Sequence, residues 1–77
     1  MNVERLVAMA NDIAAFFDAE AADKAGAAEG VRFHMSRFWE ARMRREIVAH
    51  VADGGAGLTP TARSAVELLS NSANQSK

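Results

Sequence analysis

The feature that most constrains the fold is a change of direction in the apolar pattern at mid-chain. In one straight helix, with a rotation of about 100° per residue, the apolar residues of 31–38 would share a face. Those of 43–51 would drift round to the opposite side. These residues are Val31, Met35 and Phe38 in the first set, and Met43, Ile47 and Val51 in the second. One buried stripe cannot turn in this way, so we predict a break or kink near residues 39–41. A single long helix buried on several sides is the alternative.

The first helix is predicted over about residues 2–20. Asn2 is a suitable N-cap, and Glu4 lies in the first turn, where the helix dipole favours a negative charge. Apolar residues then recur at spacings of three and four. They are Val3, Leu6, Val7, Ala10, Ile13, Ala14 and Phe17. Met9 and Phe16 widen this stripe, so we expect the helix to contact two neighbours.

Three further helices are predicted, over about residues 24–39, 41–53 and 60–69. Residues 21–30 are rich in alanine and contain Gly26 and Gly30, so they form either a loop or the frayed start of the second helix. Three glycines at 54, 55 and 57 stop the third helix, and Thr59 followed by Pro60 starts the fourth. The polar residues 70–77 are predicted to be a disordered tail. The fold class is therefore all-α: one domain, 1–69, built as a small bundle of three to four helices.

Composition excludes several classes of protein. The chain of 77 residues has no cysteine, which removes disulfides and thiolate metal sites. No stretch reaches the roughly 18 apolar residues of a membrane span, and residues 1–17 do not resemble a signal peptide. We therefore expect a cytoplasmic protein without a membrane partner. Much of the apolar content is alanine, so the core is thin and the chain would gain stability by docking on a partner.

Charge is unevenly distributed along the chain. Residues 1–30 contain six acidic and two basic residues, whereas residues 31–52 contain five arginines and two glutamates. This polarity favours an oriented contact surface over a general polyanion-binding one. Catalytic patterns are absent: His34 and His50 lie sixteen residues apart, and neither has the spacing of a helical metal site. The sequence therefore predicts no active site.

The remaining functional signal is the segment 38–45, which holds the lone tryptophan and three arginines. Arginine suits interfaces because its planar guanidinium binds carboxylates and stacks on rings, and tryptophan with arginine is typical of binding hot spots. A solvated helix face is the plain alternative for the arginines, and Trp39 could equally fill the core between two helices. The predicted partner-binding residues are Phe38, Trp39, Arg42, Met43, Arg44 and Arg45.

Three segments of the sequence resemble the delta subunit of NAD-dependent formate dehydrogenase. They are the run 3–13 followed by Phe16-Phe17, the element Phe38-Trp39-x-x-Arg42-Met43-Arg44, and the turn Gly54-Gly55-x-Gly57-Leu58-x-Pro60. The resemblance covers roughly residues 3–69. One departure is Glu40-Ala41, where the family often has Asp-Pro, a helix start that agrees with the break predicted from periodicity. With Ala41 the break is less strongly enforced.

The resemblance implies a non-catalytic accessory subunit that binds the catalytic and diaphorase subunits of a cytosolic formate dehydrogenase. It implies a role in assembly, stability or cofactor insertion. The complex is expected to carry a bis-pterin molybdenum or tungsten centre, iron–sulfur clusters, FMN and NAD, with none of these on this chain. Self-association of the isolated chain stays open.

Two alternatives remain at the level of sequence. The arginines could hold the pyrophosphate of the pterin cofactor in a chaperone step. A helix carrying Arg37, Arg42, Arg44 and Arg45 could also bind nucleic acid. An isoelectric point near 6.1 and the acidic first helix argue against nucleic acid.

Overall fold

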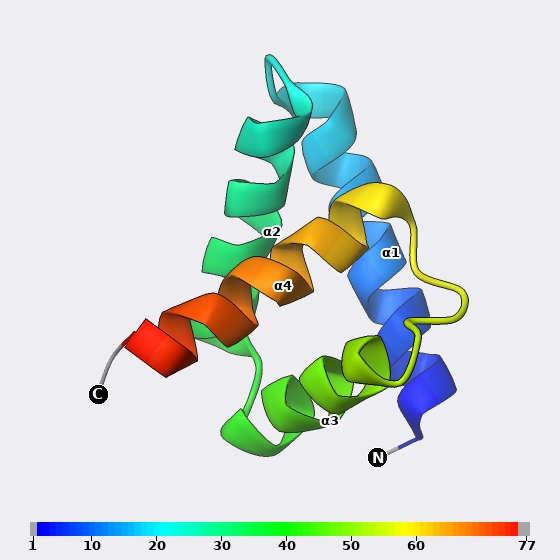
Figure 1. Ribbon diagram of the computed structural model, residues 1–77. Coiled ribbons are helices and arrows are strands. Elements are labelled where there is room, and N and C mark those ends of the chain that lie inside the picture. The colour runs from blue at the N-terminus through cyan, green and yellow to red at the C-terminus, as the bar shows by residue number, and fades with distance from the viewer. Residues whose placement is uncertain (1, 76–77) are drawn as a thin grey trace.

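A computed structural model describes residues 2–75, and four helices account for most of them (Figure 1). They are α1 (Val3–Glu20), α2 (Lys24–Phe38), α3 (Ala41–Ala52) and α4 (Pro60–Gln75). No strand occurs in this part of the chain. The predicted all-α class is therefore confirmed, together with the predicted break near residues 39–41.

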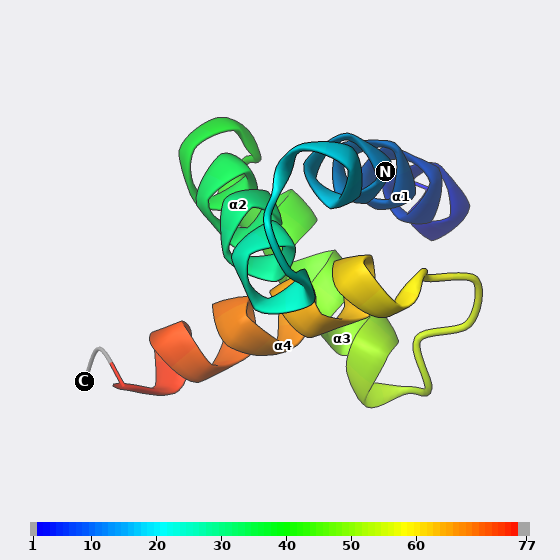
Figure 2. The same ribbon diagram turned by 90° about the horizontal axis from the view of Figure 1, so that it is seen from above.

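The helices form two layers. α1 and α2 run in opposite directions and are joined by a short turn at residues 21–23 (Figure 1). α4 crosses this hairpin, and α3 lies beside α4 on the same side of it (Figure 2). The opposite side of the hairpin is not covered by any other described helix (Figure 2).

Three of the four described helices begin at a side-chain cap. The Asn2 side chain accepts a hydrogen bond from the amide of Glu4 at 2.7 Å, and the Asp23 side chain accepts one from the amide of Gly26 at 2.7 Å. At α4 the Thr59 hydroxyl accepts from the amide of Ala62 at 3.3 Å, while Pro60 fills the first helical position. These contacts satisfy amides that have no partner inside the helix. α3 differs, because Glu40 at its N-cap makes no such side-chain bond.

The break between α2 and α3 is two residues long. Trp39 has extended backbone angles, φ −87° and ψ 141°, and Glu40 is likewise extended. The Trp39 amide still donates to the carbonyl oxygen of Met35 at 3.0 Å, so α2 closes its last turn before the chain leaves it. Two consecutive extended residues reset the helical phase, so the apolar faces of both helices reach one core.

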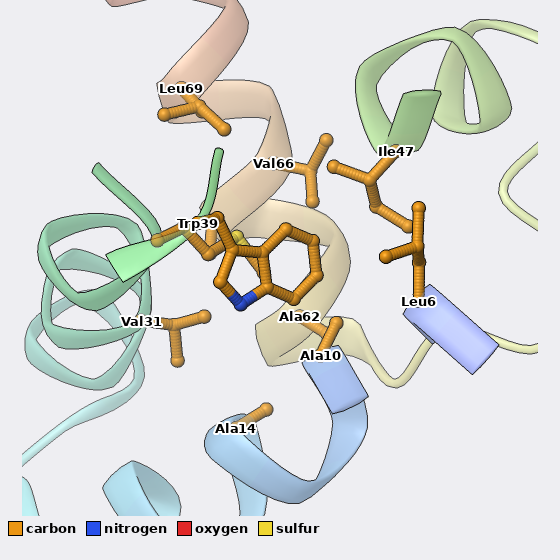
Figure 3. Packing of buried hydrophobic residues seen from close by; sticks show 11 residues of the cluster. Leu6, Ala10, Ala14, Val31, Trp39, Ile47, Ala62, Val66 and Leu69 are labelled. Atoms are coloured by element: carbon orange, nitrogen blue, oxygen red, sulfur yellow. The ribbon is translucent and has the colours of Figure 1, made fainter. Parts of the chain in front are cut away.

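The core lies where all four helices meet, with the Trp39 indole at its centre (Figure 3). Small alanines from α1 and α4 let the helices approach the ring closely. The buried cluster consists of Leu6, Ala10, Ala14, Val31, Met35, Trp39, Ile47, Ala62, Ala65, Val66 and Leu69. The last four of these form the apolar stripe of α4. One buried polar group joins the two layers, because the Thr61 hydroxyl donates to a carboxylate oxygen of Asp18 at 2.6 Å.

The loop between α3 and α4 is held by side chains from elsewhere in the chain. Asn11 of α1 donates to the carbonyl oxygen of Gly57 at 2.9 Å and accepts from the amide of Thr59 at 3.0 Å. Arg63 of α4 donates to the carbonyl oxygen of Gly54 at 2.8 Å. These hydrogen bonds therefore tie the loop to α1 and to α4.

The C-terminal prediction differs from the structure. Residues 70–75, predicted to be disordered, continue α4 as far as Gln75. Residues 76 and 77 lie outside the described part of the chain. Polar composition suggested a tail, but no glycine or proline interrupts residues 70–75, so nothing local stops the helix.

Candidate partner-binding surface

The structure divides the six predicted binding residues into two groups. Trp39 is only 5% exposed, and Met43 is half-buried and packs against the same core. Arg44 is half-buried, whereas Phe38, Arg42 and Arg45 are exposed. Three of the six residues therefore remain on the surface in the folded chain.

Trp39 is a core residue and not an exposed interface residue. The extended backbone at position 39 turns the side chain back between α1, α2 and α4, where it lies near Val31, Ala62 and Ala10 (Figure 3). An aromatic side chain of this size contributes most when it fills the meeting point of several helices. The interface role that the sequence left open for this ring is therefore corrected.

The Arg44 side chain contacts the α2–α3 junction. Its guanidinium donates a hydrogen bond to the carbonyl oxygen of Trp39, five residues earlier. This contact ties the first turn of α3 to the break, at the helix end where Glu40 provides no side-chain cap. Arg44 therefore stabilises the fold, and its guanidinium is not fully available to a partner.

Two arginines of α3 point away from the core. Arg42 and Arg45 lie three residues apart on the side of the helix opposite Ile47, so their side chains are neighbours on the surface. We call this pair the arginine edge. The Arg42 guanidinium reaches a carboxylate oxygen of Glu46 at 3.5 Å, but its side chain is 76% exposed. A pair so exposed contributes little to stability and can be exchanged for a partner's carboxylate.

A second exposed surface was not predicted. Three phenylalanines are largely exposed: Phe16 at 61%, Phe33 at 55% and Phe38 at 69%. We call them the aromatic band. The apolar pattern predicted that Phe16 widens the stripe of the first helix and that Phe38 shares the buried face of Val31 and Met35, and only Phe38 was assigned to binding. The exposure of both rings corrects this placement: Phe16 lies at the edge of its stripe, and Phe38 is the last residue of α2.

Both histidines make contacts within the described part of the fold. His50 Nε2 lies 2.8 Å from the carbonyl oxygen of Ala56 and so belongs to the α3–α4 loop. The His34 ring stacks on Phe38, with centroids 4.8 Å apart. Within the described residues, no group of three or more metal-ligating side chains comes together. None of the helices described is long and apolar enough to cross a membrane.

The comparisons with known proteins give one result. No curated protein matches the chain, and no solved structure does. A family model described as the NADH-dependent formate dehydrogenase delta subunit matches residues 5–66, which include most of α1, all of α2 and α3, the glycine loop and the first turns of α4. By this match the chain belongs to the family of NADH-dependent formate dehydrogenase delta subunits.

Proposed function

We propose that this chain is a non-catalytic accessory subunit of a cytoplasmic formate dehydrogenase, which it serves by binding the large catalytic subunit. The single observation that carries the proposal is membership of the delta-subunit family over residues 5–66. The matched family is described as a delta subunit of the enzyme, which supports a role within a complex. The proposed role is support of assembly, stability or cofactor insertion.

The chemistry of the chain supports a binding role over a catalytic one. The two histidines hydrogen-bond or stack within the fold, and the described residues bring no metal-ligand group together. Following the family membership, we propose that the pterin metal centre, the iron–sulfur clusters, FMN and NAD lie on the larger subunits. This chain would contribute surface complementarity and, by covering apolar surface on its partner, stability.

The arginine edge is the proposed polar contact. Arg42 and Arg45 project from a helix whose other face is fixed in the core through Ile47, so their backbone positions are set before binding. A pre-positioned pair loses less conformational entropy on docking than two side chains of a mobile loop. Planar guanidinium groups then select carboxylates on the partner.

The test is retention of this chain by a tagged catalytic subunit after co-expression. The Arg42→Ala/Arg45→Ala variant should be retained at least about tenfold less at moderate salt, as expected for loss of interface arginines. The matched control is Arg5→Ala/Lys24→Ala, which removes two exposed charges from α1 and α2 and should be retained like the parent. Equal retention of both variants would remove the arginine edge from the proposal. Failure of the parent chain to be retained at all would contradict the function itself.

The cofactor-insertion role has its own measurement. Complex assembled without this chain should contain less metal and pterin per catalytic subunit, and the isolated chain should not oxidise formate. If the chain holds the cofactor directly, the isolated protein will bind pyrophosphate at millimolar concentration. If it acts only as a docked subunit, cofactor content will fall while pyrophosphate produces no shift.

A further inference from the structure

The three exposed phenylalanines of the aromatic band all lie on the α1–α2 hairpin, Phe16 near the end of α1 and the other two on α2. The Phe16 ring packs edge-on against Phe17, with centroids 5.2 Å apart at 86°. The Phe17 ring in turn lies so close to Gly30 of α2 that a Cβ there would overlap it. This close approach links the aromatic side chains of the two helices.

The surface continues along α2. Phe33 and His34 follow Gly30 by three and four residues, which places them one turn further on the same side of the helix. His34 then stacks on Phe38 at 4.8 Å, and the Arg37 guanidinium lies over the Phe33 ring, 5.5 Å from its centroid. The aromatic band therefore runs from the end of α1 to the end of α2.

No described helix covers this surface. α3 and α4 pack on the other side of the hairpin, against the buried stripes of α1 and α2 (Figure 2). Taking a phenylalanine side chain as about 200 Å², the three rings expose on the order of 350 Å² of apolar surface. Patches of this size on small soluble proteins are commonly interaction sites.

The charges beside the band differ in sign between its two ends. Arg37 has no carboxylate partner within the described residues and makes only its contact with the Phe33 ring. Phe16 is flanked one turn before and after by the exposed carboxylates Asp12 and Glu20. A complementary surface would carry an acidic group opposite Arg37 and a basic group opposite the two carboxylates.

We propose that the aromatic band docks into an apolar depression on a larger formate dehydrogenase subunit with that charge arrangement. This inference rests on the proposed function and assigns it a second surface. A second copy of the chain is a poorer occupant, because the roughly 350 Å² of the band is less than each protomer of a stable dimer buries. The band supplies less than half of the roughly 800 Å² per partner of a standard interface. A larger, concave partner can cover the band together with its polar surroundings.

The experiment titrates the purified chain into the larger subunits assembled without it. The Phe16→Ser/Phe33→Ser variant should bind at least about tenfold more weakly than the parent, because aromatic anchors dominate docking. The Phe16→Leu/Phe33→Leu variant keeps most of the apolar surface and should bind within about threefold of the parent. Leu68→Ser, at a half-buried position of α4 away from the band, is the matched control and should bind like the parent.

A second variant guards against loss of folding. Arg37→Glu changes an exposed side chain, so it should keep the helical circular dichroism of the parent and still weaken binding about tenfold by charge reversal. Parent-like binding by both the serine and the glutamate variants would overturn the band while leaving the proposed function intact. No binding by the parent would overturn both. A parent dimer in sedimentation that the serine variant dissociates, with subunit binding unchanged, would assign the band to a second copy and overturn the inference.

Discussion

The two connections around α3 are held by different physical means. The α2–α3 junction is short and is fixed by the buried Trp39 ring, and Arg44 donates a hydrogen bond to the Trp39 carbonyl oxygen. The α3–α4 loop has no large ring of its own. It is held by hydrogen bonds from Asn11 and Arg63 and uses three glycines with positive φ. One connection depends on core packing, whereas the other depends on local geometry and polar contacts.

The difference shows where this chain uses Trp39, the one aromatic side chain among the described residues that is buried. Burial of the indole at the junction fixes the angle between α2 and α3. It thereby fixes the direction in which the arginine edge projects. The loop needs only to return the chain to α4, a task that hydrogen bonds and glycines can perform. Mutations in the two connections should therefore change the free energy of unfolding by different amounts.

The largest effect is expected at the junction. Trp39→Ala removes the centre of the core and should lower the free energy of unfolding by about 3–5 kcal/mol. Trp39→Phe keeps part of the packing and should lose clearly less. Chemical denaturation followed by far-ultraviolet circular dichroism measures both variants. An alanine variant within 1 kcal/mol of the parent, a margin of about fivefold in the folding equilibrium, would mean that the ring does not organise the core.

A smaller loss is expected at the loop clamp. Asn11→Ala leaves the part-buried amide of Thr59 and the carbonyl of Gly57 without their side-chain partner. The cost should be about 1–2 kcal/mol. Asn11→Asp keeps the acceptor for Thr59 and loses only the donor to Gly57, so it should fall between the alanine variant and the parent. Amide hydrogen exchange at Thr59 should quicken in the alanine variant and change less in the aspartate variant.

The glycine conformation gives the third prediction. Gly55 has φ +67° and is buried, and a Cβ at this position would lie 2.9 Å from the Arg63 guanidinium, which would have to shift. Gly55→Ala should destabilise the chain by roughly 1–2 kcal/mol. Gly55→Asn separates the two causes, since asparagine tolerates this backbone better but still meets Arg63. Equal thermal stability of the parent and both variants would show that the loop is less tightly closed than described.

The smallest effect has the opposite sign. Glu40 is the N-cap of α3 and forms no side-chain cap bond, so Glu40→Asp can add one to an α3 amide. The expected gain is about 0.5–1 kcal/mol, visible as a higher melting temperature. Glu40→Ala serves as the control and should be close to neutral. A stabilising alanine variant would indicate that the glutamate charge, and not a missing cap, limits the junction.

The sequence predicted the junction better than the surfaces around it. The change of apolar phase between 31–38 and 43–51 requires a break, and the break occurs at Trp39 and Glu40. Periodicity could not decide whether the indole faces inward, because a ring at a break can point to either side. The backbone angles at Trp39 decide this, and they depend on packing from all four helices.

Long-range contacts explain most of what the sequence missed. Asn11 and the loop that it clamps are separated by more than 45 positions, and no local pattern joins them. Phe17, which packs against Phe16 of the aromatic band, likewise makes a long-range contact, its close approach to Gly30. The sequence identified Gly30 only as a residue that weakens a helix. The sequence treats the arginines of 42–45 as one predicted binding group, and only the structure separates Arg44, bonded to the junction, from Arg42 and Arg45 on the surface.

The central claim is that the chain keeps its indole for its own core and offers phenylalanine and arginine side chains to a partner. Hydroxyl-radical footprinting of the free chain and of the assembled complex tests this claim in one measurement. The account predicts that Trp39 is protected in both samples, whereas Phe16, Phe33 and Phe38 are oxidised in the free chain and protected in the complex. A Trp39 that is reactive in the free chain and protected only in the complex would contradict it, as would phenylalanines that react equally in both.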